Sequence, residues 1–94
     1  MQGKFLEELS VGQSAELVRT VGEADIVAFA EVTGDNNPVH LDADYAAKAP
    51  FGERIAHGML SAGYISAVLG AKLPGPGAIY LSQTLRFKRP VKIG

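Results

Sequence analysis

A short run of the chain combines a carboxylate, an amide and an imidazole in a way that could support proton transfer. The run TGDNNPVHLD, residues 33–42, contains Asp35, Asn37 and His40, and Pro38 restricts the backbone between them. A carboxyl and an imidazole beside one small site form a usable acid–base pair. Histidine suits this role because its ordinary pKa lies near neutrality. The same run could also be a plain surface loop or a metal-binding loop.

The metal-binding alternatives fit the spacing poorly. A calcium loop of the EF-hand type needs glycine at its sixth position and an acid at its twelfth, but counting from Asp35 gives His40 and Ala46. A zinc site made from His40, Asp42 and Asp44 would have neither a second histidine nor a cysteine. The sequence therefore predicts no metal site and no metal cofactor.

A second candidate feature is the tripeptide HGM, residues 57–59. We expect Gly58 in the first turn of an apolar helix, where backbone N–H groups have no partner inside the helix. A residue without a side chain leaves such an N–H open to a ligand carbonyl, and the helix dipole reinforces it, as in an oxyanion hole. Alternatively, Gly58 only lets a strand approach closely, and His57 only packs or caps locally.

These residues need helices and turns to position them. Residues 23–32 are predicted to form a helix, with acids in the first turn and Gly34 just past its end. Its apolar residues lie mostly on one face: Ile26, Phe29, Ala30 and Val32. Pro38 and Gly34 prevent residues 35–40 from continuing this helix. Residues 42–49 are predicted to form a short helix with Asp42 or a neighbour as its N-cap.

The most apolar segment, residues 56–73, predicts a central helix buried on all sides, which ends at the PGPG sequence of residues 74–77. It is about the minimum length for a membrane span, but His57, Lys72 and several small polar residues argue against membrane insertion. Residues 14–21 and 78–91 are predicted to be strands. Two strands cannot close a sheet around such a helix, so further strands must come from another chain or from a longer protein.

The composition limits the possible classes of function. Ninety-four residues make one domain, and a hydrophobic content of 47% is high for so small a core. The excess suggests an oligomer or a ligand tunnel, although a compact monomer is the alternative. The net charge of −1 predicts no general attraction to nucleic acid. The chain contains no cysteine, which fits a cytoplasmic protein, and its N-terminus does not look like a signal peptide.

Basic residues gather near the end of the chain, whereas all ten acids lie at or before Glu53. The cluster consists of Arg86, Lys88, Arg89 and Lys92. It is read either as the solvated face of a strand or as a contact for a small ligand that carries phosphate.

Three stretches together resemble a known family. Residues 34–40 match the pattern G-D-x-N-P-x-H, and the stretches FGERIAHGML and LRFKRPVKIG are also similar to it. The family is the MaoC-like, or hydratase 2, group of (R)-specific enoyl-CoA hydratases. The resemblance implies an α+β hot-dog fold, in which an antiparallel sheet wraps around a long central helix. Residues 1–94 would form one such domain, incomplete at the C-terminus because family members continue with further strands.

The resemblance also implies a reaction, the addition of water to trans-2-enoyl-CoA to give (R)-3-hydroxyacyl-CoA. Asp35 and His40 would be catalytic, Asn37 would position the substrate, and Gly58 would supply the oxyanion hole. No cofactor is expected, since coenzyme A arrives as part of the acyl-CoA thioester substrate. We expect a cytoplasmic homodimer or higher oligomer. The alternatives are a dehydratase or thioesterase acting on acyl carrier protein or CoA thioesters, and a non-catalytic acyl-CoA-binding module.

Overall fold

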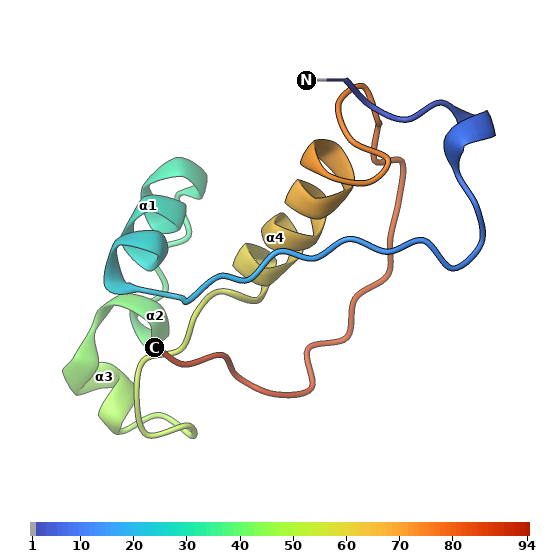
Figure 1. Ribbon diagram of the computed structural model, residues 1–94. Coiled ribbons are helices and arrows are strands. Elements are labelled where there is room, and N and C mark those ends of the chain that lie inside the picture. Colours follow the sequence, from blue (N-terminus) through green and yellow to red (C-terminus); the bar gives the residue numbers. More distant parts are fainter. Residues whose placement is uncertain (1) are drawn as a thin grey trace. The chain divides into compact units, whose positions relative to one another are not determined.

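The computed structural model describes residues 2–94, and its regular elements are helical (Figure 1). They are the short 3₁₀ helix η1 (Leu6–Glu8) and the helices α1 (Glu23–Thr33), α2 (Pro38–Leu41), α3 (Ala43–Ala47) and α4 (Gly58–Ala71). The chain divides into two units. One contains the chain up to Val18 and Ser61–Leu85, and the other contains Arg19–Leu60 and Arg86–Gly94. The candidate catalytic residues all lie in the second unit.

Helix α1 confirms the helix predicted for residues 23–32 and is one residue longer. The Gly22 N–H donates a hydrogen bond to the Asp25 carboxylate at 2.8 Å, which caps the first turn. The helix ends at Gly34, whose φ of 80° suits a residue without a Cβ. Ile26 and Ala30 are buried, but Val32 is 87% exposed, so its placement on the same face as these residues was wrong. Val32 lies about 200° around the helix from Ala30, on the opposite side.

Two capping side chains start the short helices α2 and α3. The Asn37 Oδ1 accepts a hydrogen bond from the Val39 N–H at 3.1 Å, at the start of α2. The Asp42 carboxylate accepts two from the first turn of α3, at 3.0 and 3.1 Å, so its prediction as an N-cap is confirmed. Helix α3 is shorter than the predicted range of 42–49. Helix α2 was not predicted, because it is a single turn that begins at the proline expected to interrupt helical structure.

Helix α4 forms where a helix was predicted, and it ends before the PGPG sequence. The expectation that it is buried on all sides is wrong for residues 2–94, in which Ala62 is its one buried residue. Met59 and Ile65 are about half exposed. Its apolar surface would need further elements to cover it. In the described part of the chain, no helix is long and apolar enough to cross a membrane.

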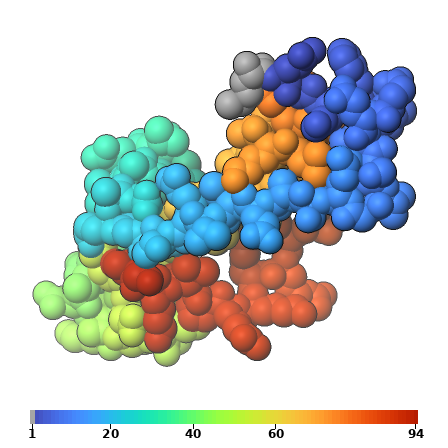
Figure 2. Space-filling view, viewed as in Figure 1, coloured from blue at the N-terminus to red at the C-terminus, as the bar shows by residue number. Residues whose placement is uncertain are grey.

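The two segments predicted as strands, residues 14–21 and 78–91, are not strands in the described chain. The pairing found within residues 2–94 is one isolated antiparallel bridge between Ile55 and Lys92. A strand requires hydrogen bonds to a neighbouring strand along its length, and these segments have no such neighbour in the described part. Several of their apolar side chains are consequently uncovered, among them Val18 at 87% and Leu81 at 90% exposed, whereas Val21 is buried. In Figure 2 the last part of the chain, in red-orange to red, is visible on the face in view.

The basic residues near the end of the chain are all exposed, which is compatible with both readings of this cluster. The Lys92 ammonium lies 3.3 Å from the Glu53 carboxylate. This contact joins the last residues of the chain to the segment that precedes α4, within the second unit.

Candidate active site

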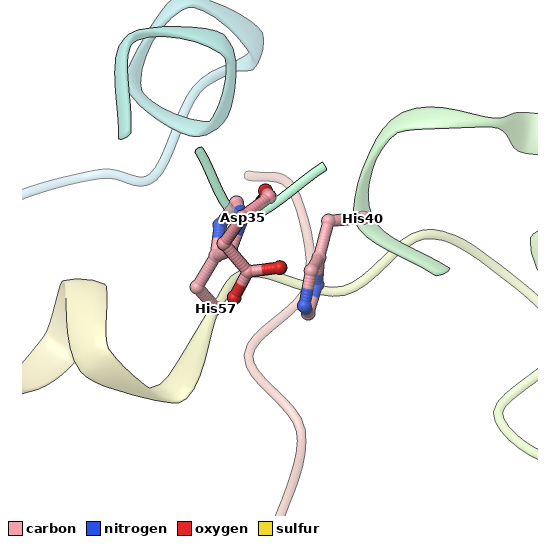
Figure 3. A group of neighbouring side chains, drawn as sticks. All are labelled: Asp35, His40 and His57. Carbon is pink, nitrogen blue, oxygen red and sulfur yellow. The ribbon is translucent and has the colours of Figure 1, made fainter. Parts of the chain in front are cut away.

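Three side chains that could transfer protons meet in the second unit (Figure 3). Asp35 follows α1, His40 lies in α2, and His57 immediately precedes α4. One carboxylate oxygen or ring nitrogen from each lies within 4.8 Å of the other two. The two histidines are buried, whereas Asp35 is exposed. The expected convergence of Asp35 and His40 is observed, although their catalytic roles stay predictions.

The His40 ring is held in one tautomer by a backbone carbonyl. Its Nδ1 lies 2.7 Å from the carbonyl oxygen of Ile55. A carbonyl can only accept a hydrogen bond, so Nδ1 carries the proton and donates. In the neutral ring, Nε2 therefore carries a lone pair. His40 can thus accept a proton at Nε2.

His57 joins this site although the sequence interpretation left it as a residue that more often packs or caps. Its Nε2–H donates a hydrogen bond to the backbone carbonyl of Asp35 at 3.0 Å. The centres of the His57 and His40 rings are 3.9 Å apart, and the Phe29 ring centre lies 4.6 Å from that of His57. The sequence signal was the position of His57 beside Gly58, but nothing in the sequence showed that its ring contacts Asp35 and His40.

The segment of residues 54–57 connects the loop that carries Asp35 and His40 to the C-terminal residues. The Ile55 N–H donates to the Val39 carbonyl at 3.3 Å, so the backbones are joined close to His40. The Ala56 N–H donates to the Val91 carbonyl at 2.7 Å, which ties this segment to the C-terminal residues. The site therefore depends on three separate stretches of the chain.

Arg54 adds a further link between α1 and α2. Its Nε–H donates to the His40 carbonyl at 2.7 Å, and its Nη1 donates to the Glu23 carboxylate at 2.6 Å. The hydrogen bond from Arg54 holds the pKa of Glu23 below its ordinary value. The arginine side chain is 14% exposed and the glutamate side chain 62%. The sequence interpretation had assigned no role to Arg54.

Gly58 and Asn37 occupy the expected elements, and each has a structural role there. Gly58 is the first residue of α4, so its N–H has no partner within the helix. An ideal Cβ on Gly58 would lie 2.9 Å from two ring atoms of Phe87, so close packing also favours glycine. Asn37 is exposed and caps α2 through its side-chain oxygen. The predicted roles of both residues toward a substrate stay predictions.

Asp35, His40 and His57 could be considered as metal ligands because of their proximity. The ring planes of the two histidines are inclined by 31° at a centre-to-centre distance of 3.9 Å. The lone pair of an imidazole lies in the plane of its ring, so rings stacked in this way do not direct two lone pairs toward one ion. The geometry favours acid–base chemistry over chelation.

A family model described as "MaoC like domain" matches residues 6–94. A "3-hydroxybutyryl-CoA dehydratase" of Methylorubrum extorquens is 57% identical over 90 residues, which are 96% of this chain and 57% of that protein. An "(R)-specific enoyl-CoA hydratase" of Rhodospirillum rubrum is 58% identical over 90 residues, which cover 96% of this chain and 62% of the relative. The chain thus spans less than two thirds of the length of these relatives.

The solved structures of similar proteins extend the comparison to the fold. An unliganded R-hydratase from Pseudomonas aeruginosa matches with a TM-score of 0.88 and 62% identity, over 94% of this chain and 57% of that one. An (R)-hydratase from Aeromonas caviae, "involved in PHA biosynthesis", matches with a TM-score of 0.89 and 49% identity, over 94% of this chain and 67% of that one. Residues 2–94 therefore adopt a fold similar to the corresponding part of these hydratases.

Proposed function

Because this chain belongs to the MaoC-like domain family, we propose that it catalyses hydration of trans-2-enoyl-CoA to (R)-3-hydroxyacyl-CoA. Relatives named as enoyl-CoA hydratase and as 3-hydroxybutyryl-CoA dehydratase support this substrate class, since dehydration is the reverse of hydration. A complete hot-dog sheet around α4, a homodimer and a cytoplasmic location are parts of the same proposal. The exposed apolar surface of α4 and of residues 78–91 supports the sheet and the dimer.

The geometry supports a reaction in which water adds across the C2=C3 double bond. The thioester carbonyl accepts a hydrogen bond from the Gly58 N–H, which stabilises the enolate-like charge that develops on its oxygen. His40 Nε2 takes a proton from the water as the water oxygen bonds to C3, and Asp35 holds this water. The new C–H bond at C2 takes its proton from the same pair of residues. No metal or redox cofactor has a role in this proposal.

One observation carries the proposal more than any other. The Ile55 carbonyl fixes the proton of His40 on Nδ1, which leaves Nε2 as the basic nitrogen of a ring that has a nitrogen atom within 4.8 Å of an Asp35 carboxylate oxygen. A base must have an unprotonated atom within reach of the water that it activates. The tautomer of His40 provides such an unprotonated nitrogen before any substrate binds.

A second candidate differs in the carrier of the acyl group. A mitochondrial 3-hydroxyacyl-[acyl-carrier-protein] dehydratase of Arabidopsis thaliana is 43% identical over 86 residues, which are 92% of this chain and 51% of that protein. The same site chemistry would serve a thioester on acyl carrier protein. Parallel assays with crotonyl-CoA and a crotonyl thioester of acyl carrier protein distinguish the two carriers.

The proposal is tested by the loss of enoyl absorbance from crotonyl-CoA, with the chirality of the product determined. We expect Asp35→Asn and His40→Gln each to lower turnover by about 10²–10⁴-fold with the fold intact, which is the usual contribution of a general acid or base. Asp44→Asn is the matched control, because Asp44 is an exposed acid close in sequence that lies outside the site.

Near wild-type turnover in either site variant would contradict the assigned roles. Release of free thiol without loss of the double bond would identify a thioesterase. Binding of crotonyl-CoA with neither reaction would identify a non-catalytic acyl-CoA-binding module.

A further inference from the structure

His57 is the most buried polar residue of the candidate site, with 2% of its surface exposed. It has no part in the proton transfers described above. Its ring lies against those of His40 and Phe29, so one role of the side chain is to fill space. An aromatic hydrocarbon ring of similar size could fill the same space.

Two features of His57 go beyond filling space. Its Nε2–H donates to the carbonyl of Asp35, the residue that carries the carboxylate, across 22 positions of the sequence. Its Nδ1 is buried and has no hydrogen-bond partner among residues 2–94. A buried polar atom without a partner is unfavourable. A phenylalanine would avoid that cost but would lose the bond to Asp35.

The loop around Asp35 has few other long-range connections. The Asp35 N–H donates to the Thr33 hydroxyl at 3.1 Å, and the Asn37 N–H donates to the Asp35 carboxylate at 3.3 Å, both over two positions of the sequence. His40, in contrast, is held through Ile55 at its side chain and through Arg54 at its carbonyl. His57 therefore supplies at Asp35 the long-range restraint that residues 54 and 55 supply at His40.

We propose that His57 is a positioning residue, which fixes the Asp35 backbone and packs against the face of the His40 ring. The Asp35 carboxylate and His40 Nε2 are thereby directed toward the same water. This inference rests on the proposed hydratase function. A misplacement of about 1 Å in a catalytic group can lower a rate by about 10²-fold. The effect of His57 acts through Asp35 and His40, so it alters the rate of the chemical step more than substrate binding.

Two substitutions at this position separate the hydrogen bond from the packing. His57→Phe keeps a ring between Phe29 and His40 but removes the donor. His57→Gln places an amide N–H near the position of Nε2 and restores a donor. Ile26→Val is the stability control. Ile26 is fully buried in α1, and its hydrocarbon side chain cannot form a hydrogen bond to the loop.

The three variants are measured in the full 94-residue chain for kcat and KM with crotonyl-CoA and for the urea midpoint of unfolding. We expect His57→Phe to lose about 10–10²-fold in kcat with little change in KM, and His57→Gln to recover most of this loss. Ile26→Val should lower the urea midpoint and leave kcat unchanged. A wild-type kcat in His57→Phe, or no recovery in an equally stable His57→Gln, would overturn the inference.

A second readout does not depend on turnover. The ¹³C chemical shift of the Asp35 carbonyl, measured without substrate, reports the hydrogen bond from His57. We expect it to move in His57→Phe and to return toward the wild-type value in His57→Gln. If the wild-type chain hydrates no crotonyl-CoA, the proposed function fails, and this shift alone decides whether His57 positions the loop. An unchanged shift in His57→Phe would overturn the inference in either case.

Discussion

Phe87 lies where a side chain on residue 58 would have to go. An ideal Cβ at Gly58 would lie 2.9 Å from two atoms of the Phe87 ring, which is closer than real Cβ contacts. The ring is 59% exposed, so it can move aside. Gly58 therefore has two possible reasons to be glycine, namely the open N–H and the packing of Phe87. The sequence suggested both reasons but not the residue that packs there.

These two reasons predict different behaviour in a double variant. Gly58→Ala places a methyl group against the Phe87 ring and, if the N–H binds the thioester oxygen, lowers kcat by about 10²-fold or more. Phe87→Ala alone should keep most of the activity. We expect the double variant Gly58→Ala/Phe87→Ala to stay slow in the crotonyl-CoA assay. Recovery of the Phe87→Ala rate in the double variant would instead show that Gly58 serves only the packing.

The site residues that could be predicted were those that lie close together in the sequence. The spacing of Asp35 and His40 around Pro38 indicated an acid–base pair because both side chains lie on one short, restricted loop. His57 was interpreted as a residue that more often packs or caps locally, and its contact with Asp35, which crosses 22 positions, was not predicted. Residue types and their spacing in the sequence do not indicate such long-range contacts, because these depend on how separate elements pack.

At the scale of elements, Arg54 links the start of α1 to the end of α2. Its guanidinium contacts the Glu23 carboxylate and the His40 carbonyl at 2.6 and 2.7 Å. Its Nη2 is buried and has no hydrogen-bond partner in residues 2–94. The side chain thus combines an exposed ion pair with a part-buried backbone contact close to the site.

The ion pair predicts a specific dependence of stability on pH. The hydrogen bond from Arg54 holds the pKa of folded Glu23 below its ordinary value of about 4.5. The ion pair therefore contributes to folding stability. This contribution is complete above the pKa of Glu23 in the unfolded chain and is lost as the pH falls through its lower pKa in the folded chain. We expect Glu23→Gln to lower the urea midpoint at neutral pH and to have less effect in acid. The effect should be small because the carboxylate is exposed.

Glu31→Gln provides the control for this measurement, since Glu31 is an exposed acid near the other end of α1. Its urea midpoint should not show the same loss at neutral pH. An equal effect of Glu23→Gln at neutral and acid pH would contradict the assigned linkage.

The helices α1, α3 and α4 could be predicted at this scale, whereas the single-turn helix α2 could not, nor could the lack of strand pairing along residues 78–91 in the described chain. Helix α1 has its cap, its acids and its terminating glycine within its own sequence, so its limits were correct to one residue. Residues 78–91 show an alternating pattern but need a neighbouring strand to complete their hydrogen bonds. In the described chain, the one bridge joins Ile55 and Lys92. The alternating pattern therefore indicated which apolar side chains need to be buried, but not which element buries them.

At the scale of the whole molecule, exposed apolar side chains recur along residues 78–91. Ile79 is 79% exposed and Leu81 is 90% exposed. Extended backbone with an uncovered apolar row tends to pair with another chain. This agrees with the high hydrophobic content of 47% in so short a chain.

We expect this segment to pair with its own copy across a two-fold axis. Sedimentation at micromolar concentration should then show a dimer or larger oligomer, and Leu81→Lys should weaken it. Val32→Lys is the matched control, because Val32 is also about nine-tenths exposed but lies on a helix. A stable monomer of the wild-type chain at that concentration would rule out the pairing.

The contacts that arrange the site share a property that bears on its evolution. The side chains of His40, His57 and Arg54 each donate to a main-chain oxygen, that of Ile55, Asp35 or His40 respectively. Every amino acid carries that oxygen, so a change of the accepting residue need not be matched by a change of the donor. Analyses of paired substitutions across related sequences would therefore give no sign of these three contacts, even though they fix the geometry of the loop.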